Sequence, residues 1–456
     1  MGCFMCHSCI EDGFTTSSSD LLEFSCDSVK FDTVFTELGT PTKTFVVYNR
    51  HKKQLNISSI RVAGGSKNFR INVDGRSGEV FNDIEVRGQD SIYVFVVCYI
   101  DANESDKPIE VSDKLEFVTN GVTQKITLNA WGQDVVRLYN ERVEHGELRL
   151  TAAKPYVIFD SLTVDQRARL VIEPDAKLHF HKGAKLRIDG TLQAQGTQGH
   201  EIIMRGDRID NVVGEYSFEL MSGQWWGVVF GPTSEGNEMS YVNMRSSSYG
   251  VEVYGTNGEN RNLHLFNSIL HNSSGDVLRC ENAWVEAEGC EFSDAAAVVV
   301  RILGGRTQLV HCTLANYYLF EISKESILTI DHGNYDMRKF VIDNSIIYGM
   351  TNDISPGEFP AGVDVLLRNC LFKSKGTDDN NFINSIWDAD PLFYVIRNDY
   401  LFDYRLKNDS PAIGTGDNSF CPDHARYDRY GEDRRVRDRV DVGAYTWVPT
   451  TTEEKQ

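Results

Sequence analysis

A small β-sandwich followed by a right-handed parallel β-helix is the all-β fold that this sequence predicts, and three observations predict it. Apolar pairs recur every eight residues between Leu162 and Ile188. A four-residue unit recurs at coil-like intervals between Asn267 and Phe372. The chain before about residue 134 consists of short alternating apolar runs separated by turns, with no helical period of useful length.

The eight-residue period predicts the coils of the solenoid. Four leucines mark it, each followed two positions later by a second apolar residue: Leu162, Leu170, Leu178 and Leu186, followed by Val164, Ile172, Phe180 and Ile188. Such a pair is a short strand with two inward side chains, and the polar run after it is a corner. Three of these units make a triangular coil of about 24 residues. A period of eight drifts quickly off one face of a helix, so a helix does not explain it.

Farther along, one four-residue unit marks successive coils. It occurs as Asn267–Leu270, Gly289–Phe292, His311–Leu314, Asn344–Ile347 and Asn369–Phe372. Its second position is always small: Ser268, Cys290, Cys312, Ser345 and Cys370. Small inward residues stacked from coil to coil suit a narrow corner. We therefore expect these cysteines to be buried and unbonded, since free cysteine is commonly a small core residue.

Residues 21–134 predict an immunoglobulin-like sandwich of about seven short strands. Apolar or alternating runs occur at 44–48, 55–62 and 91–100. Asn120-Gly121 stands between alternating residues of the stretch 115–128, which is the signature of a hairpin with a type I′ turn. No nucleophile–base pattern occurs here, so we expect this domain to act as a spacer.

Composition excludes some partners. The 456 residues carry a formal charge of −20, which argues against nucleic acid, because a phosphate backbone demands a basic face. The same charge repels anionic polysaccharides unless a cation or a local basic groove intervenes. No run approaches the roughly 18 apolar residues of a membrane-spanning helix.

The first residues admit several interpretations. Cys3, Cys6 and His7 match the haem c attachment pattern, and Cys3, Cys6 and Cys9 have metal-cluster spacing without a fourth ligand nearby. Met1-Gly2 is a myristoylation start without the usual hydroxyl residue at position six. The interpretation favoured here is the end of a bacterial lipoprotein signal, with Ser8 before an acylated Cys9 and a polar tether through residue 20.

This start resembles that of surface lipoproteins from Bacteroides-type bacteria, in which acidic residues follow the acylated cysteine. The resemblance implies an extracytoplasmic protein held by lipid at the outer membrane or cell surface. We expect an upstream basic and apolar signal segment ending at Ser8.

Residues 135–447 resemble right-handed parallel β-helix proteins of the pectate-lyase-like class, and 448–456 are expected to form a disordered tail. The stretch Gly223–Phe230 looks like a coil common in lipoproteins that contain an Ig-like domain and a β-helix. The passage 390–445 is similar to the closing segment of bacterial β-helices and is expected to cover the last coil. Its arginines between 426 and 439 alternate with acids and predict a salt-bridged surface.

Enzymes of this class hold calcium with carboxylates or use paired aspartates as acid and base. The weak catalytic candidates that fit are two clusters: Asp331, His332 and Asp336, and Asp378 with Asp379. The paired-aspartate signature of polygalacturonases is missing, and either cluster reads equally as a polar loop. No cofactor is assigned, with calcium left open. Aromatic candidates for stacking on sugar rings are Trp284, Tyr317, Tyr318, Tyr335 and Tyr249.

These features favour a surface-exposed, lipid-anchored protein that binds or organises polysaccharide without turnover. Two alternatives stay open: a β-helix polysaccharide lyase or glycoside hydrolase, and a cell-surface adhesin. Release of oligosaccharides that depends on Asp331, His332 and Asp336 distinguishes the enzyme from the binder. The expected partners are a polysaccharide or cell-surface glycan and outer-membrane lipid.

Overall fold

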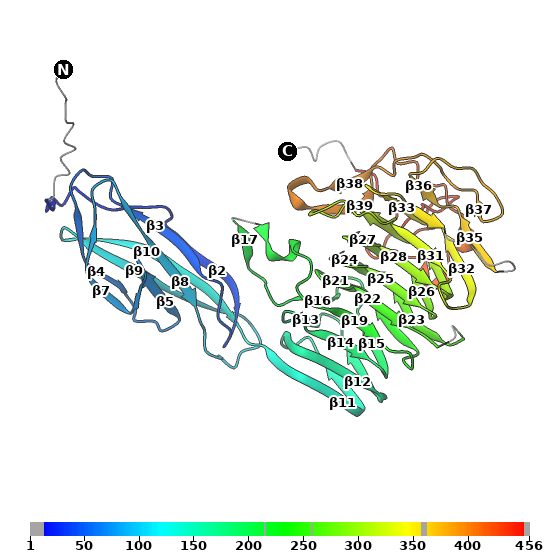
Figure 1. Ribbon diagram of the computed structural model, residues 1–456, viewed down its shortest axis with the longest axis horizontal. Helices are drawn as coiled ribbons and strands as arrows, with labels where there is room; N and C mark the ends of the chain where they lie inside the picture. The colour runs from blue at the N-terminus through cyan, green and yellow to red at the C-terminus, as the bar shows by residue number, and fades with distance from the viewer. Residues whose placement is uncertain (1–12, 214–215, 257–258, 357–362, 451–456) are drawn as a thin grey trace, which may run out of the picture. The chain divides into compact units, whose positions relative to one another are not determined.

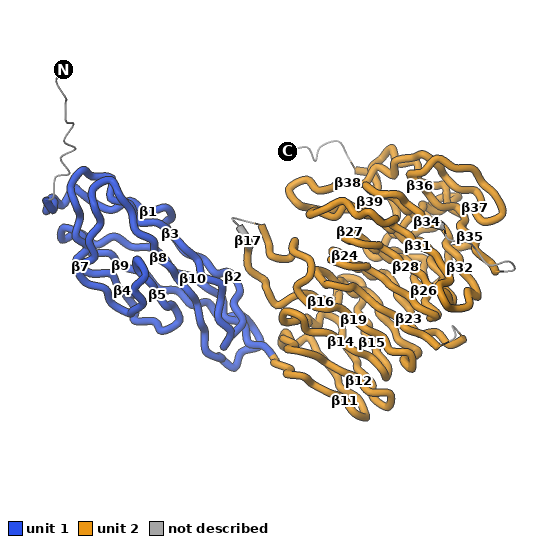
Figure 2. Tube along the Cα trace, in the orientation of Figure 1, with its two compact units in different colours: residues 1–135 blue, residues 136–456 orange. Residues whose placement is uncertain are grey.

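The computed structural model describes residues 13–213, 216–256, 259–356 and 363–450, and these form two compact units, residues 1–135 and 136–456 (Figure 2). Both are built from strands, and the predicted fold class is confirmed (Figure 1). Within the described ranges no helix is long and apolar enough to cross a membrane. The helices there are four 3-10 turns: η1 (Phe218–Leu220), η2 (Asn398–Tyr400), η3 (Asn418–Phe420) and η4 (Asp423–Ala425).

Unit 1 is a sandwich of two five-stranded sheets. The first sheet has the order β1 (Glu23–Phe24), β3 (Lys43–Tyr48), β8 (Ser91–Cys98), β5 (Phe69–Val73) and β6 (Arg76–Gly78). The second has the order β2 (Ser28–Phe35), β10 (Val122–Gln133), β9 (Ile109–Thr119), β4 (Leu55–Val62) and β7 (Val80–Val86). The predicted hairpin is confirmed: β9 and β10 pair antiparallel around Asn120 (φ 52°) and Gly121 (φ 77°).

Unit 2 is a solenoid that begins with two long strands, β11 (Val136–Leu150) and β12 (Tyr156–Ile172). Each bends through all three sides of a coil. The later coils contribute one short strand to each of three parallel sheets, named A, B and C here.

Sheet A comprises β13 (Lys177–Phe180), β16 (Ile202–Gly206), β21 (Val242–Arg245), β24 (Ile269–Ser273), β27 (Glu291–Ala295), β30 (Thr313–Asn316), β33 (Ile346–Gly349) and β36 (Leu371–Phe372). Sheet B comprises β14 (Lys185–Ile188), β19 (Gly227–Phe230), β22 (Val251–Tyr254), β25 (Leu278–Glu281), β28 (Val300–Leu303), β31 (Leu328–Asp331) and β34 (Ile354–Pro356). Sheet C comprises β15 (Thr191–Gln195), β20 (Asn237–Ser240), β23 (Arg261–Phe266), β26 (Trp284–Glu288), β29 (Gly305–Val310), β32 (Met337–Asp343), β35 (Asp364–Arg368) and β37 (Phe382–Ile383).

The period of eight describes the coil correctly. Leu162 pairs with Leu186, 24 positions later, while Leu170 and Leu178 lie on the two other sheets between them. All four leucines are fully buried. The coil that begins at Leu162 therefore places one leucine of the repeat into the core from each sheet.

The four-residue unit forms the corner between sheets C and A. Its first residue has a left-handed backbone in all five coils, with φ between 44° and 64°: Asn267, Gly289, His311, Asn344 and Asn369. Glycine and asparagine tolerate this conformation best, which explains their frequency at this position. In the second position Cys290, Cys312 and Cys370 are buried and free, as predicted.

A loop after β16 covers the outer face of sheet A at its N-terminal end. It contains β17 (Asn211–Val213), β18 (Tyr216–Ser217) and η1. The amide of Asn272 donates to the carbonyl oxygens of Glu219 and Leu220, at 3.1 and 3.0 Å. The Ser246 hydroxyl also donates to the Glu219 carbonyl, at 2.6 Å. These bonds fix the loop to β24 and to the end of β21.

Residues 388–449, called the C-terminal segment here, cover the remainder of the same face. The segment contains β38 (Phe393–Ile396) and β39 (Phe402–Leu406), which lie beside the last coils in Figure 1. Its apolar residues Phe393, Tyr404 and Val442 share one cluster with Ala315 and Ile346 of sheet A.

The C-terminal segment also reaches far back along the solenoid. The sequence predicted that it covers the last coil, but it covers earlier coils as well. Gln198 Nε2 donates to the carbonyl of Tyr430 at 2.8 Å, and Arg429 pairs with Glu201 at 2.7 Å. Gln198 and Glu201 belong to the loop that follows β15. The segment therefore closes the side of sheet A and its corner with sheet C.

The arginines of the segment divide into two kinds. The expected surface ion pairs form between Arg426 and Asp433 and between Arg435 and Asp423, whereas Arg437 pairs with the buried Asp441. Arg434 is buried and donates to the carbonyls of Ala425 and Ala444, at 3.2 and 2.7 Å. A purely surface role for the cluster was therefore wrong, because Arg434 satisfies main-chain acceptors inside the segment.

Candidate functional site

Aromatic side chains lie along sheet B, on β22 and on the corners and loop beside its strands, whereas much of sheet A is covered. Trp226, Tyr249 and Tyr335 are 40%, 44% and 38% exposed, and Tyr254 is half-buried. Together with the polar residues between them they form a continuous surface. We call it the aromatic face: Trp226, Tyr249, Glu252, Tyr254, Arg279, Glu281 and Tyr335.

The first part of this face begins with two adjacent tryptophans at the corner between sheets A and B, immediately before β19. Trp225 points inward, is fully buried and stacks on Phe180 with ring centroids 4.0 Å apart. Its neighbour Trp226 is 40% exposed, and Gly227, with φ 132°, separates it from the alternating residues of β19. Tyr249 lies one coil later, its amide bonded to the Trp226 carbonyl at 2.9 Å. The two rings lie 4.5 Å apart, so they form an exposed ladder.

Gly250 allows the coils to approach closely at this ladder. Its φ is 58°, and a Cβ atom there would lie 2.1 Å from the carbonyl oxygen of Val277 on the next coil. Any larger residue would force these coils apart. The glycine therefore sets the position of Tyr249.

Glu252 lies at the centre of the face. It accepts hydrogen bonds from Trp226 Nε1 at 3.1 Å and from the Tyr254 hydroxyl at 3.0 Å, one on each carboxylate oxygen. Burial and the neighbouring Glu252 raise the pKa of Tyr254 to about 12, so its phenol stays protonated and remains a donor.

The next coil continues the pattern. Tyr254 and Glu252 are in register with Glu281 and Arg279. Arg279 Nε donates to Glu281 Oε1 at 2.7 Å, and the Tyr335 hydroxyl lies 3.4 Å from Glu281 Oε2. The face thus presents aromatic rings on both sides of a central row of fixed charged groups.

Its dimensions and chemistry suit an extended ligand. The four strands β19, β22, β25 and β28 span about 14 Å, since neighbouring strands lie about 4.8 Å apart. Flat rings can pack on the apolar C–H faces of sugars, and carboxylates and guanidinium groups can exchange hydrogen bonds with hydroxyl pairs.

The predicted aromatic contacts fall in different places. Tyr335 and Tyr249 lie on the aromatic face. Trp284 lies on sheet C, where its Nε1 donates to Glu286 at 3.0 Å and Arg306 covers its ring at 4.5 Å. Tyr318 is buried with its hydroxyl 2.6 Å from that of Ser222, and Tyr317 packs against Tyr404 of the C-terminal segment.

The first predicted carboxylate cluster lies in an exposed loop after β31. Asp331, His332 and Asp336 all have exposed side chains, and Asp331 Oδ1 accepts the Gly333 amide at 3.1 Å. Tyr335 of the same loop reaches the aromatic face. The cluster therefore lies next to the candidate site in sequence, with Asp331 serving a local turn.

The second predicted cluster shapes another loop. Asp378 Oδ1 accepts hydrogen bonds from Trp387 Nε1 and the Ser385 amide, both at 3.1 Å. Asp379 Oδ1 accepts the amides of Asn381 and Phe382, at 2.7 and 2.9 Å. Both carboxylates hold the chain around β37, which accounts for their proximity.

For a metal ion, the described residues offer one group of three close ligand atoms, on His264, Glu288 and His424 at the edge of sheet C. None of the five predicted acid or histidine residues belongs to it. Cys9, the predicted lipidation site, lies outside the described residues.

Trp226 and Tyr254 are members of the face that sequence reasoning missed. The pair Trp225-Trp226 gave no usable signal, because it precedes β19 and the alternation through Val228 would place Trp226 inward. The motif Val251-Glu-Val-Tyr254 held a usable signal for Tyr254, since the valines alternate with Glu252 and Tyr254. The contact of Tyr335 with Glu281 had no comparable signal, because 54 residues separate them.

Comparisons with known proteins do not identify a family for this chain. No protein-family model matches the chain, and no curated protein matches it. A solved protein of unknown function from Porphyromonas gingivalis W83 is 13% identical over 28% of this chain and 59% of its own, with a TM-score of 0.20. A family 123 glycoside hydrolase from Clostridium perfringens, described in work on glycolipid glycan hydrolysis, is 8% identical over 25% of this chain, with a TM-score of 0.18. The chain spans 26% of that hydrolase's length.

Proposed function

We propose that this protein binds a neutral polysaccharide along the aromatic face of sheet B and does not turn it over. The observation that carries the proposal is the exposed ladder of Trp226 and Tyr249 beside Glu252. Large exposed aromatic rings next to fixed polar groups are typical of surfaces that bind a ligand with one apolar and one polar side.

The charge distribution favours a neutral glycan. Glu252 and Glu281 are balanced on the face by Arg279 and by Lys185, whose Nζ lies 5.9 Å from the centre of the Trp226 ring. Asp276 beside the face pairs with Arg301 at 2.7 Å. No excess of basic groups offsets the formal charge of −20. A polyanion would therefore meet long-range repulsion without a compensating local field.

The hydrogen bonds of Glu252 favour binding over catalysis. Both of its oxygens already accept bonds from Trp226 and Tyr254. These bonds hold the carboxyl group in one orientation. A fixed acceptor of this kind suits recognition of hydroxyl groups, whereas a general acid must direct its proton at the leaving group of the substrate.

A glycan array probed with the full chain, with and without calcium, tests the proposal. Neutral oligosaccharides that bind are then titrated by calorimetry against Trp226→Ala and Tyr249→Ala. Each substitution should weaken binding about tenfold, the equivalent of about 1.4 kcal/mol. Trp131→Ala is the matched control, because that tryptophan is 43% exposed on unit 1 and should not affect affinity.

The enzyme alternative has its own measurement. New reducing or unsaturated ends should not appear when the binding glycans are incubated with the protein. Replacement of Asp331, His332 and Asp336 together by alanine should leave affinity nearly unchanged. Release of oligosaccharides that this triple variant abolishes would replace the proposal with a lyase or hydrolase.

We also propose that the protein is held at the outer membrane or cell surface by lipid on Cys9. The support is the sequence Ser8-Cys9 followed by acidic residues and a polar tether. Mass spectrometry of the protein isolated from its own cells should find acylated Cys9 at the N-terminus. A free N-terminus at Met1 would contradict the anchor and leave the glycan proposal standing.

A further inference from the structure

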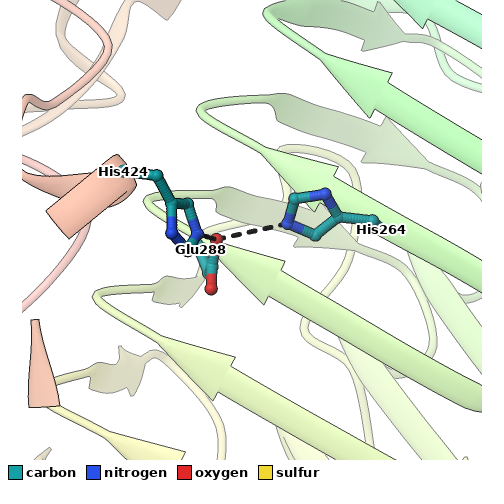
Figure 3. A group of neighbouring side chains, drawn as sticks. All are labelled: His264, Glu288 and His424. Carbon is teal, nitrogen blue, oxygen red and sulfur yellow. Dashed lines mark hydrogen bonds and ion pairs between the residues drawn. The ribbon is translucent and has the colours of Figure 1, made fainter. Parts of the chain in front are cut away.

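Three side chains converge at the edge of sheet C where the C-terminal segment lies against it (Figure 3). His264 comes from β23, Glu288 from the next coil at the end of β26, and His424 from η4. Glu288 Oε2 lies 3.2 Å from Nε2 of His264 and 2.5 Å from Nε2 of His424. Two imidazoles thus present their Nε2 atoms to the same carboxylate oxygen.

The register of β23 and β26 explains why His264 and Glu288 lie close together. Phe266 and Glu288 are paired neighbours on adjacent strands, and His264 lies two residues before Phe266 on the same outer face. The His424 ring lies 6.2 Å from that of Phe266 and 6.4 Å from that of His264. The site therefore combines a rigid part on sheet C with one residue of the segment that covers it.

Burial divides the three groups in a way that suits a bound ion. The side chains of His264 and Glu288 are 15% and 13% exposed, and that of His424 is 60% exposed. The two inner ligands are held by the sheet, and the outer one leaves a path for an ion and for water. The two imidazoles are also the polar partners of the largely buried Glu288 side chain.

We propose that His264 Nε2, the Glu288 carboxylate and His424 Nε2 bind a divalent transition-metal ion of the zinc class. Two imidazoles and one carboxylate are a common zinc ligand set, with Zn–N and Zn–O distances of about 2.0–2.2 Å. Tetrahedral ligands at such distances lie about 3.3 Å apart, close to the 3.2 Å between His264 and Glu288. The exposed His424 side chain has room to widen its shorter separation.

The ligand types also exclude the hard cations. Calcium prefers six to eight oxygen ligands, and magnesium an octahedron of oxygens and waters. Two imidazole nitrogens instead favour zinc, nickel, copper or cobalt. Water completes the coordination at the exposed side.

The ion would fasten the C-terminal segment to the solenoid. His424 is separated from Glu288 by 136 residues, so one ion closes a long loop of chain. Direct bonds already hold the same region: Arg429 Nη1 donates to the Asn267 carbonyl at 2.6 Å, and Asn267 Nδ2 donates to the Tyr427 carbonyl at 3.2 Å. The metal adds a fixation that responds to ion concentration.

The experiment must separate this site from the cysteines near the N-terminus. Cys3, Cys6 and Cys9 can themselves bind zinc, so zinc is titrated by calorimetry into the full chain carrying Cys3→Ser, Cys6→Ser and Cys9→Ser after treatment with chelator. We expect one zinc ion per chain. Cobalt bound in its place should show visible d–d absorption without thiolate charge-transfer bands.

Substitutions then assign the ligands. In the same background His424→Gln should weaken zinc binding by more than the 10- to 100-fold that loss of an outer-shell partner typically costs. Glu288→Gln should do the same. His200→Gln is the matched control, because His200 is an exposed imidazole beside a carboxylate, 2.7 Å from Asp175, outside the site. It should bind zinc as the background does.

A second readout tests the fastening directly. Zinc should slow amide hydrogen exchange in residues 421–430 of the background protein and leave exchange unchanged in His424→Gln. Absence of zinc binding in the background protein, or equal binding by His424→Gln, would overturn the site. Binding without any change in exchange would overturn its role in holding the segment.

Discussion

The hydroxyl of Tyr404, in the C-terminal segment, donates a 2.6 Å hydrogen bond to Oδ2 of Asp294 on sheet A, although 110 residues separate them. Both side chains are buried. His271 Nδ1 lies 3.2 Å from the same oxygen, and the Tyr445 hydroxyl makes a parallel bond to Glu291 at 2.5 Å. Buried tyrosines thus anchor the segment on charged groups of the solenoid's outer face.

Tyr404→Phe should lower the free energy of unfolding by about 1–3 kcal/mol, because it leaves a buried carboxylate oxygen with one partner fewer. Burial and the charge of Asp294 raise the pKa of Tyr404 well above its usual range, so the wild-type phenol is a donor at all working pH values. Urea unfolding followed by fluorescence measures the loss.

The control for this substitution is Tyr139→Phe. That residue is 61% exposed and stacks on Phe159, so loss of its hydroxyl should change the stability little. Equal stability of Tyr404→Phe and the wild type would show that the segment does not depend on the Asp294 bond.

Acid should destabilise the solenoid through two buried histidines. Burial lowers the pKa of His179 to about 3 and that of His311 well below its usual value. Unfolding exposes both to water, where they take up protons below about pH 6.5. Their contribution is complete above that value and is lost as pH falls, at about 1.4 kcal/mol per pH unit for each histidine.

His179→Gln isolates one of these terms. Unfolding free energies measured between pH 7 and 5 should fall less steeply in the variant, by about 1 kcal/mol per unit on average, because the unfolded histidine is only partly protonated near pH 6.5. Glu291 and Asp343, whose pKa values burial raises, act in the opposite sense in both proteins, so the difference cancels them. His332→Gln, at an exposed position, should keep the wild-type slope; an unchanged slope in His179→Gln would contradict the argument.

The coils were predictable because the core of a β-helix is built from neighbours in sequence. Leu162, Leu170, Leu178 and Leu186 each occupy equivalent positions, so a period visible in one coil predicts where the next strand begins. The same locality predicted the buried thiols, since Ser268 and Cys290 occupy one column at successive corners.

The contacts of the C-terminal segment and the grouping of the site residues could not be predicted from local repeats. Tyr404 meets Asp294, and His424 meets Glu288, across more than 100 residues without any repeat that relates them. Arg434 belongs to a run of alternating charges that looks like a surface, but it turns inward to main-chain carbonyls. Whether Tyr318 is buried likewise depends on which segment covers it, which local patterns do not encode.

The column of small residues at the corner predicts which substitutions the core tolerates. The Ser345 hydroxyl donates to the Asp343 carbonyl at 2.8 Å, and Cys312 Sγ lies 3.4 Å from the equivalent carbonyl of Val310. Cys312→Ser can form the same bond and should change the unfolding free energy by less than about 1.5 kcal/mol.

Cys312→Leu provides the contrast. It adds atoms to a closed corner and should cost about 1–3 kcal/mol or more. Thiol labelling of the native wild type should leave Cys312 unmodified, because burial raises its pKa well above the usual value. Rapid labelling of Cys312 without unfolding would show that the corner opens in the native state.

Asn344 combines the corner conformation with a fixation of the C-terminal segment. Its φ is 48°, its amide donates to the Asp417 carbonyl at 2.9 Å, and its side-chain oxygen accepts the Asp417 amide at 2.8 Å. Asn344→Gly keeps the backbone relaxed but loses both bonds, which should cost about 1–3 kcal/mol. Asn344→Ala should cost about 1–2 kcal/mol more, because a Cβ atom strains the left-handed conformation.

Urea unfolding of the two variants separates these causes, with Asn140→Gly as the control. Asn140 also has a left-handed backbone, with φ 45°, but it is exposed on β11, where its Oδ1 accepts the Ser161 hydroxyl at 2.9 Å. We expect that variant to remain close to the wild type. Equal losses of unfolding free energy in Asn344→Gly and Asn344→Ala would show that backbone strain at this position costs nothing. An unfolding free energy of Asn344→Gly equal to that of the wild type would show that the Asp417 pairing does not stabilise the fold.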